Sequence, residues 1–322
     1  MDNFEDAPER PDLHTIGFYN VENLFDIYDD KRTNDNDFLP ISAKKWTPNR
    51  YDNKLRKLSF TIANIGRLET GKPPAVMGLA EVENAKVIED LINYEHLKSY
   101  NYNYVHYNSP DERGIDVALI YNADMFKIDT TDTFSIYLEH ADGTPDYTRD
   151  ILLVSGSLHG DYIHIIVNHW SSRHEGEKET EQKRLVSSEK VAEIIDSLQT
   201  QNSDAKIIVM GDFNDNPSNQ SIKNLVNNFN LYNPMNTLRS FSRGTVLHNR
   251  QWFLFDQIFF TSNFIATTTN ALEYETADIF DVDFLKQFKG KFKGSPFRTY
   301  VGKKYHGGYS DHFPVYAILK KN

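Results

Sequence analysis

The sequence predicts a mixed fold of β-strands and α-helices (α+β), on three observations. Short apolar runs alternate along the 322 residues with longer segments whose apolar residues recur every three or four positions, as in strands and helices. Several of the apolar runs end in Asp, Asn, Glu or His. No linker, low-complexity tract or internal repeat divides the chain, so we expect an acidic tail over residues 1–12 and a single domain over residues 13–322.

Composition bounds the possible functions. Hydrophobic residues make up 39% of the chain and aromatic residues 13%, which is enough for a substantial core. The absence of cysteine excludes disulfides, thiolate metal sites and thiol nucleophiles. A formal charge of −11, from 35 basic and 46 acidic residues, disfavours indiscriminate binding of polyanions. It does not exclude nucleic acid, because a local basic groove and a bound cation can reverse the field.

The N-terminal segment is acidic and lacks the apolar stretch of a secretory signal, and no apolar run approaches the length of a membrane span. We therefore expect a cytoplasmic monomer with no membrane-spanning segment.

The first elements are a strand over residues 14–19, which ends at Asn20, and a polar loop over residues 29–49. A helix follows, because Tyr51, Leu55, Leu58, Ile62 and Ile65 form one apolar stripe. Asn20 alone could simply close its strand.

The second buried strand, residues 75–80, leads directly to Glu81, with Glu83 two positions later. Glu is rarely buried without a partner, so a carboxylate at the end of a buried strand indicates more than an ordinary surface charge. We expect Glu81 to face inward because it leaves the strand directly. Asn84 can cap the helix that follows.

Residues 113–121 predict a turn followed by a strand, and Arg113 stands where its guanidinium could reach a phosphate. An ordinary surface arginine fits the same position equally well. Residues 151–157 and 162–168 predict a hairpin whose second strand ends at His169. A helix of about twenty residues then presents Val191, Ile194, Ile195 and Leu198 to the core.

The central strand, residues 205–210, stops at Gly211 and presents Asp212 and Asn214. In an extended segment, residues two apart point the same way, so we expect these side chains to lie side by side. A carboxylate beside a carboxamide can hold a hard cation or position a phosphate oxygen.

Asp256 lies between apolar residues in a strand expected over residues 252–260. An unpaired charge there would cost several kcal/mol, so Asp256 needs a partner. The last strand is preceded by a Gly-rich turn that carries Asp311 and His312. Between them, residues 284–304 alternate Phe and Lys in an otherwise acidic chain.

Together these polar residues form an ordered set: Asn20, Glu81, His169, Asp212, Asn214, Asp256, Asp311 and His312. The set resembles that of the endonuclease/exonuclease/phosphatase superfamily, the divalent-metal phosphoesterases with the DNase I-like fold. The motifs that carry the resemblance are YNVENLFD, GDFN and RTYxGxxYxGGYSDHxPV, and they extend from Asn20 to His312. The resemblance implies a four-layer αββα sandwich with the site at one edge.

The resemblance also implies roles. Glu81 would be the principal ligand of Mg²⁺, with Mn²⁺ as a substitute, and Asn20 and Asp311 would lie nearby. Asp212 and Asn214 would position the nucleophile and the scissile phosphate, and His312 would pair with Asp256. His169 would take part in catalysis and contact the substrate, and Arg113 and Asn214 would also contact the substrate. Oxygen ligands suit Mg²⁺, and a buried carboxylate fixes the tautomer of an imidazole, so the residue types agree with these roles.

The expected substrate is a phosphodiester such as DNA or RNA, attacked in line by an activated water in an endonuclease-like reaction. Specialised abasic-site repair is disfavoured, because His169 stands where such enzymes carry Tyr. The alternatives are a phosphomonoesterase or a lipid or small-molecule phosphodiesterase of the same fold, and a catalytically inactive binding module. We also expect the segment from Phe284 to Lys304, with Arg298, to flank the site and hold an anionic arm of the substrate; a solvated insertion without a role explains it nearly as well.

Overall fold

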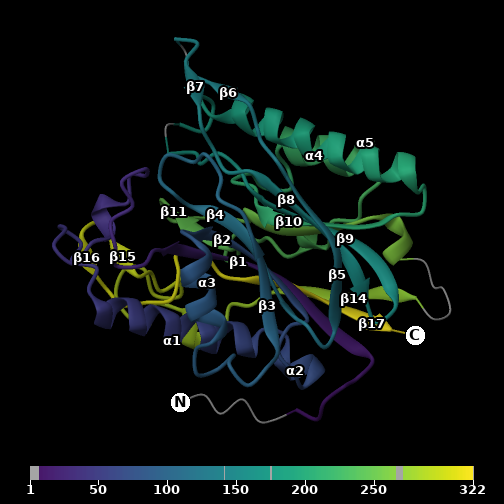
Figure 1. The fold of residues 1–322 in the computed structure, drawn as a ribbon, viewed down its shortest axis with the longest axis horizontal. Helices are drawn as coiled ribbons and strands as arrows, with labels where there is room; N and C mark the ends of the chain where they lie inside the picture. Colours follow the sequence, from purple (N-terminus) through teal and green to yellow (C-terminus); the bar gives the residue numbers. More distant parts are fainter. Residues whose placement is uncertain (1–6, 141, 175, 266–270, 322) are drawn as a thin grey trace.

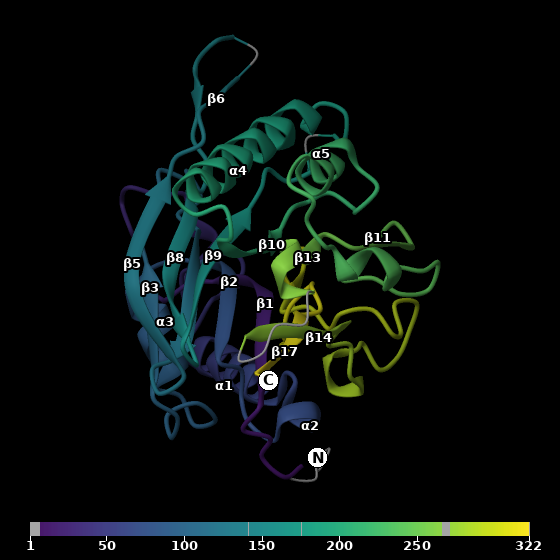
Figure 2. The ribbon, with the colours of Figure 1, turned by 90° about the vertical axis from the view of Figure 1, so that its right-hand side faces the viewer.

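A computed structural model of the protein describes residues 7–140, 142–174, 176–265 and 271–321. Residues 1–6 of the expected acidic tail lie outside this part of the chain. Two β-sheets pack face to face, and helices cover the outer face of each (Figures 1 and 2). The order of layers is helix, sheet, sheet, helix, which confirms the expected αββα sandwich.

The first sheet has six strands and contains the first and last strands of the chain. In sheet order they are β14 (Leu272–Ile279), β17 (Val315–Lys321), β1 (Leu13–Leu24), β2 (Val76–Val82), β4 (Asp116–Asn122) and β3 (Tyr102–His106). Only β1 and β2 are parallel. This sheet is covered by α1 (Pro48–Asn64), α2 (Arg67–Thr70) and α3 (Ala85–Ile92).

The second sheet has five strands, in the order β13 (Asp256–Phe260), β10 (Lys206–Asp212), β9 (Asp161–His169), β8 (Ile151–Leu158) and β5 (Phe126–Phe134). β9 and β10 are parallel, and β8 and β9 form the predicted hairpin. The sheet is covered by α4 (Glu181–Gln201) and α5 (Gln220–Asn228). Short ribbons are formed by β6 (Leu138–Glu139) with β7 (Pro145–Asp146), β11 (Val246–His248) with β12 (Gln251–Phe253), and β15 (Tyr300–Val301) with β16 (Lys304–Tyr305).

The main core fills the space between the two sheets. Phe18 and Gly78 of the first sheet face Val167 and Met210 of the second. A Cβ atom at position 78 would lie 2.8 Å from the Met210 sulfur, so only glycine allows the sheets to approach this closely. A second core lies between β9, β10 and the helices α4 and α5.

Several boundaries differ from the sequence predictions. β1 continues beyond Asn20 to Leu24, although its register with β2 shifts after Asn20. The strand expected over residues 252–260 is broken into β12 and β13, because the backbone N–H of Leu254 bonds to the Asn216 side chain and that of Phe255 to Thr245. Asp256 is therefore the first residue of β13 and not the middle of a strand. Within the described residues, no helix is both long and apolar enough to cross a membrane.

Candidate active site

Polar side chains from β1, β2, β9, β10 and β13 meet at one edge of the two sheets, beside the turn that precedes β17. Asn20 connects the sheets, because its Nδ2 donates to Asp212 Oδ2 at 3.0 Å and lies 3.4 Å from Glu81 Oε1. Three further residues of the expected set, Asn20, His169 and His312, each have a side-chain atom within 4 Å of the carboxylate of Asp212, and Asn20 and His169 also lie within 4 Å of that of Glu81.

His312 and Asp256 are in direct contact. The distance between His312 Nδ1 and Asp256 Oδ2 is 2.8 Å, and both residues are buried. The other ring nitrogen, Nε2, lies 3.8 Å from Asp212 Oδ2 and 3.9 Å from Asp311 Oδ1. The predicted hydrogen bond is thus confirmed, and the free nitrogen of His312 faces the other carboxylates.

Asp212 and Asn214 do not leave the sheet as an extended pair, which corrects the sequence prediction. Asn214 adopts a left-handed conformation (φ 49°), and its backbone N–H donates to Asp212 Oδ1 at 3.0 Å. The Asn214 side chain donates to the carbonyl oxygen of Trp170 at 3.1 Å. The Asp212 carboxylate thus closes the turn, an interaction that Asp often makes with the backbone two residues on.

Glu81 lies within β2 and not beyond its end, at an irregularity in the pairing with β4, and has a φ of 65°. Its Oε2 accepts from the backbone N–H of Asn23 at 2.9 Å. A left-handed glutamate is strained, and such strain persists where the surrounding structure holds it and clusters at functional sites. Glu83 is directed elsewhere and accepts from the backbone N–H of Asp26 at 2.6 Å.

His169 and Arg113 border the same carboxylates. His169 Nε2 lies 3.9 Å from Glu81 Oε1 and 3.8 Å from Asp212 Oδ2. Arg113 Nη2 donates to Asn23 Oδ1 at 2.7 Å and lies 4.0 Å from Glu81 Oε1, with about half of its side chain exposed.

The surroundings of His312 and His169 shift the pKa values of the two imidazoles in opposite directions. Burial alone would lower the pKa of His312, but Asp256 and Asp212 raise it well above its usual value. Burial, reinforced by the positive charge of Arg149, lowers the pKa of His169 well below its usual value. The surroundings therefore favour the cationic form of His312 and the neutral form of His169. Burial raises the pKa of Asp212 to about 7, opposed by the His312 charge.

Sequence reasoning missed two charged residues behind this cluster, Glu22 and Lys54. Glu22 is buried in β1 and accepts from the backbone N–H of Thr299 at 2.6 Å. Lys54, buried on α1, donates to Thr299 Oγ1 at 2.7 Å and lies 3.9 Å from Glu22 Oε2. Burial raises the pKa of Glu22 to about 7, and Asp311 adds to the rise. The available signal was the glutamate two positions after Asn20 in an apolar strand.

The side chains fit a hard divalent cation. Glu81 and Asp311 offer carboxylate oxygens, the ligands that Mg²⁺ and Mn²⁺ favour, while Asn20 Oδ1 accepts from the backbone N–H of Glu22 at 3.0 Å. Glu22 and Asp212 are buried carboxylates whose pKa values burial raises to about 7, with Asp311 adding to the rise at Glu22 and Asp256 at Asp212, and a cation nearby would favour their ionised forms. Asp212, Asp256 and His312 also lie close enough to share an ion. However, His312 Nδ1 and Asp256 Oδ2 already bond to each other, which favours the oxygen set.

A buried ionic network supports the loop after Asp212, and sequence analysis did not identify it. Arg173 donates from Nε to the carbonyl oxygen of Asn214 and from Nη2 to Asp215 Oδ1, both at 2.6 Å. Asp215 Oδ1 also lies 2.8 Å from Arg184 Nε, and Ser221 Oγ donates to Asp215 Oδ2 at 2.6 Å. These contacts fix the backbone at Asn214.

The Phe- and Lys-rich segment over residues 284–304 lies beside the site. Arg298 Nη2 is 3.8 Å from Asp311 Oδ2, and a pocket of about 580 Å³ extends from Asp311 to Lys289 and Lys291. The expected position of the segment therefore agrees with the structure.

Comparison with known proteins extends over nearly the whole chain. The sequence profile described as the endonuclease/exonuclease/phosphatase family matches residues 15–321. Among curated proteins no sequence matches the chain.

Solved structures share the fold. An endonuclease/exonuclease/phosphatase family protein from Bacteroides thetaiotaomicron is 19% identical, with a TM-score of 0.60, and the match covers 97% of this chain and 99% of that one. A mannosyl-6-phosphatase from the same species is 18% identical (TM-score 0.58; coverage 95% and 99%). The catalytic domain of human Nocturnin, solved with bound sulfate, is 14% identical (TM-score 0.58; coverage 98% and 96%).

Proposed function

The chain belongs to the endonuclease/exonuclease/phosphatase family of hydrolytic phosphoesterases, and from this premise we propose that it hydrolyses phosphodiesters with Mg²⁺ or Mn²⁺ and acts most like an endonuclease. The observation that carries the proposal is the contact of His312 Nδ1 with Asp256 at 2.8 Å, while His312 Nε2 lies 3.8 Å from Asp212. Such a pair can meet the negative charge of a phosphoryl oxygen, which is the principal demand of phosphoryl transfer.

We assign Glu81, Asn20 and Asp311 to hold the cation. When bound, a divalent cation neutralises charge on the phosphoryl oxygens and lowers the pKa of water. The assignment is supported by the carboxylate oxygens of Glu81 and Asp311 and by the strained backbone at Glu81, and Asn20 lies within 3.4 Å of Glu81.

We assign the remaining residues to the substrate and the attacking water. Asp212 orients the water and accepts its proton at Oδ2, while Asn214 and the neutral His169 contact the phosphate. His312 holds a phosphoryl oxygen from Nε2, and Asp256 keeps the imidazole in place through Nδ1. Water attacks in line as the ester P–O bond breaks, the leaving alkoxide takes a proton from solvent and Asp212 releases its proton to solvent, which gives a phosphomonoester and an alcohol.

A panel of substrates tests the proposal: plasmid DNA, RNA, bis-p-nitrophenyl phosphate, a phosphomonoester and sphingomyelin, each with Mg²⁺, Mn²⁺ and EDTA. We expect hydrolysis of the small diester and of a nucleic acid, with no turnover in EDTA. His312→Ala, with its fold verified by circular dichroism, serves as the background.

Other outcomes select the alternatives. Hydrolysis of the phosphomonoester alone would identify a phosphatase, and hydrolysis of sphingomyelin alone a lipid phosphodiesterase. If no substrate is hydrolysed, the catalytically inactive binding module is the remaining alternative.

A further inference from the structure

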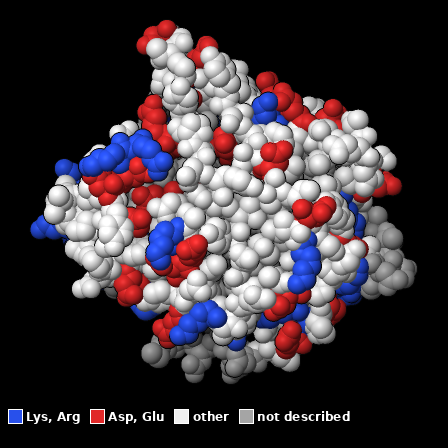
Figure 3. All heavy atoms as spheres, in the orientation of Figure 1, with Lys and Arg blue, Asp and Glu red and all other residues white. Residues whose placement is uncertain are grey.

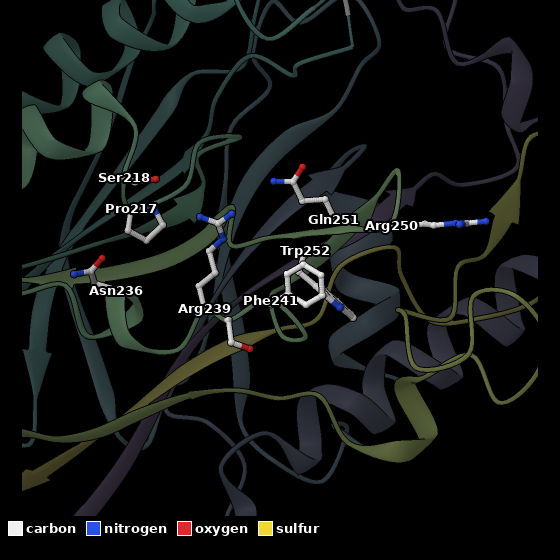
Figure 4. A pocket seen from close by; sticks show the side chains of 9 residues that line it. Pro217, Ser218, Asn236, Arg239, Phe241, Arg250, Gln251 and Trp252 are labelled. Atoms are coloured by element: carbon white, nitrogen blue, oxygen red, sulfur yellow. The ribbon is translucent and has the colours of Figure 1, made fainter.

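Two pockets lie on either side of the β11–β12 hairpin. The first has a volume of about 590 Å³. Its lining includes Pro217 and Ser218, which come shortly after the site residue Asn214 in the chain (Figure 4). The second, of about 580 Å³, includes Asp311 of the site. We name them by an exposed aromatic residue of each, the Phe241 pocket and the Phe292 pocket. Arg250, in the turn of the hairpin, lines both.

Both pockets are basic in a chain of net charge −11. Arg239 and Arg250 line the Phe241 pocket, and Arg250, Lys289, Lys291 and Arg298 line the Phe292 pocket. Among the described residues that line the two, Asp311 is the single acidic one. By contrast, the face drawn in Figure 3 mixes acidic and basic side chains. The hairpin therefore concentrates positive charge next to the site.

Exposed aromatic rings accompany the charges. Phe241 is fully exposed, Phe292 is half exposed, and Phe288 beside Lys289 is 64% exposed. Trp252 lines the Phe241 pocket and stacks on Phe313, the neighbour of His312, with ring centroids 6.0 Å apart. Trp252 thus connects the Phe241 pocket with the neighbour of the site residue His312.

Aromatic rings among cations suit one ligand chemistry best. Unpaired bases stack on exposed rings while Lys and Arg contact the phosphates, a combination typical of proteins that bind single-stranded nucleic acid. A duplex keeps its bases stacked inside the helix, and a small dianion would use the cations but leave the phenylalanines without a role. Each pocket also falls in the range of about 300 to 1,000 Å³ that holds one small ligand.

We propose that the substrate is a single-stranded nucleic acid, which crosses the β11–β12 hairpin with one nucleotide in each pocket and Arg250 between them. The strand reaches the site at Asp311. This inference rests on the proposed phosphodiesterase function and specifies its substrate class.

Binding tests the inference separately from catalysis. A fluorescein-labelled oligothymidylate, its duplex with oligoadenylate, and an inositol bisphosphate as competitor are titrated by anisotropy against His312→Ala in Mg²⁺. We expect the single strand to bind at least about tenfold more tightly than the duplex. Phe241→Ala and Phe292→Ala should each weaken binding about tenfold. Arg250→Ala should reduce the slope of log affinity against log salt by about one.

Matched controls come from other surfaces. Tyr137→Ala removes a 70% exposed aromatic ring next to β6, and Lys223→Ala removes an exposed cation on α5, and both should bind like the parent. In the wild-type background, charge reversal at Lys289 and Lys291 should raise the KM for a polymeric substrate and flatten its salt dependence.

The two hypotheses fail differently. If wild type hydrolyses bis-p-nitrophenyl phosphate but the strand binds no better than the duplex, or Phe292→Ala binds like the parent, the substrate inference is wrong and the function stands. Competition by the bisphosphate that is stronger than that of the strand also overturns the inference. If no diester is hydrolysed while the strand binds as expected, the function is wrong and the binding surface stands.

Discussion

Asp256 Oδ2 and His312 Nδ1 lie 2.8 Å apart, although 56 positions separate the two residues in the chain. Asp256 is fully buried, and within the described residues its second oxygen, Oδ1, has no hydrogen-bond partner. The carboxylate therefore depends on His312 for compensation of its charge. The pair couples β13 to the turn before β17, so the stability and the chemistry of the site depend on one contact.

Replacement of His312 tests the catalytic half of this pair. His312→Ala removes the cationic ring that faces Asp212 and Asp311, and we expect kcat to fall by on the order of 10²-fold or more. Turnover of bis-p-nitrophenyl phosphate at saturating Mg²⁺ measures the loss. A variant within a fewfold of wild type would exclude His312 from the reaction.

Asp256→Asn tests the positioning role. Asparagine retains the size of the side chain but removes the charge that keeps the pKa of His312 raised. We expect much of the loss seen with His312→Ala, and an unchanged Mg²⁺ affinity by isothermal titration. A parallel loss of Mg²⁺ affinity would instead make Asp256 a metal ligand.

Glu81→Gln tests the metal assignment. The variant keeps a side chain of the same shape but removes a charged oxygen ligand, so turnover should be abolished at ordinary Mg²⁺ with the melting temperature little changed. The matched control is Glu83→Gln, whose amide oxygen can still accept from the backbone of Asp26. Near wild-type activity in Glu81→Gln after chelation and Mg²⁺ titration would transfer the ligand role to Glu83.

The sequence was sufficient to predict contacts that avoid a large free-energy cost, such as that of an unpaired buried charge. Asp256 among apolar neighbours had to have a partner, and the resemblance supplied His312. The β8–β9 hairpin, the helix α4 and the cap at Asn84 were also confirmed, because each depends on local periodicity or on one side chain.

Features that depend on tertiary contacts could not be predicted from the sequence. In the sequence nothing distinguishes Lys54 from an ordinary lysine of a helix. Its burial depends on a contact with Thr299, 245 positions away. The left-handed turn at Asn214 is held by Trp170 and Arg173, which no local pattern indicates. The edge strands β5 and β14 escaped prediction because they expose one face and carry few apolar residues.

Asp215 should stabilise the fold through a buried ionic network. Its side chain is 2% exposed and contacts Arg173 and Arg184, so removal of the carboxylate takes an ionic partner from both guanidinium groups, although Arg173 keeps its pair with Glu177. We expect Asp215→Ala to lower the free energy of unfolding by about 3–5 kcal/mol in urea denaturation. Glu193→Ala, which breaks the exposed pair with Lys190, should cost less than about 1 kcal/mol. Equal effects of the two variants would contradict the network.

The pH dependence of the stability should reveal the titration of His14, which is buried near the start of β1. Neither ring nitrogen has a hydrogen-bond partner among the described residues, and the ring stacks on His159 at 3.9 Å. Burial, with His159 and Lys72 adding to the effect and Asp12 opposing it, lowers the pKa of His14 to about 3.

Between about pH 6.5 and pH 3 the unfolded chain therefore binds a proton at His14 that the folded chain does not, so this residue lowers stability as the pH falls. His14→Phe keeps the ring stacked on His159 and removes the titration. Urea denaturation between about pH 7 and pH 4 should show a shallower loss of stability for His14→Phe than for wild type, while His140→Phe at an exposed position should follow wild type. Parallel curves for His14→Phe and wild type would mean that His14 titrates alike in the folded and unfolded chains.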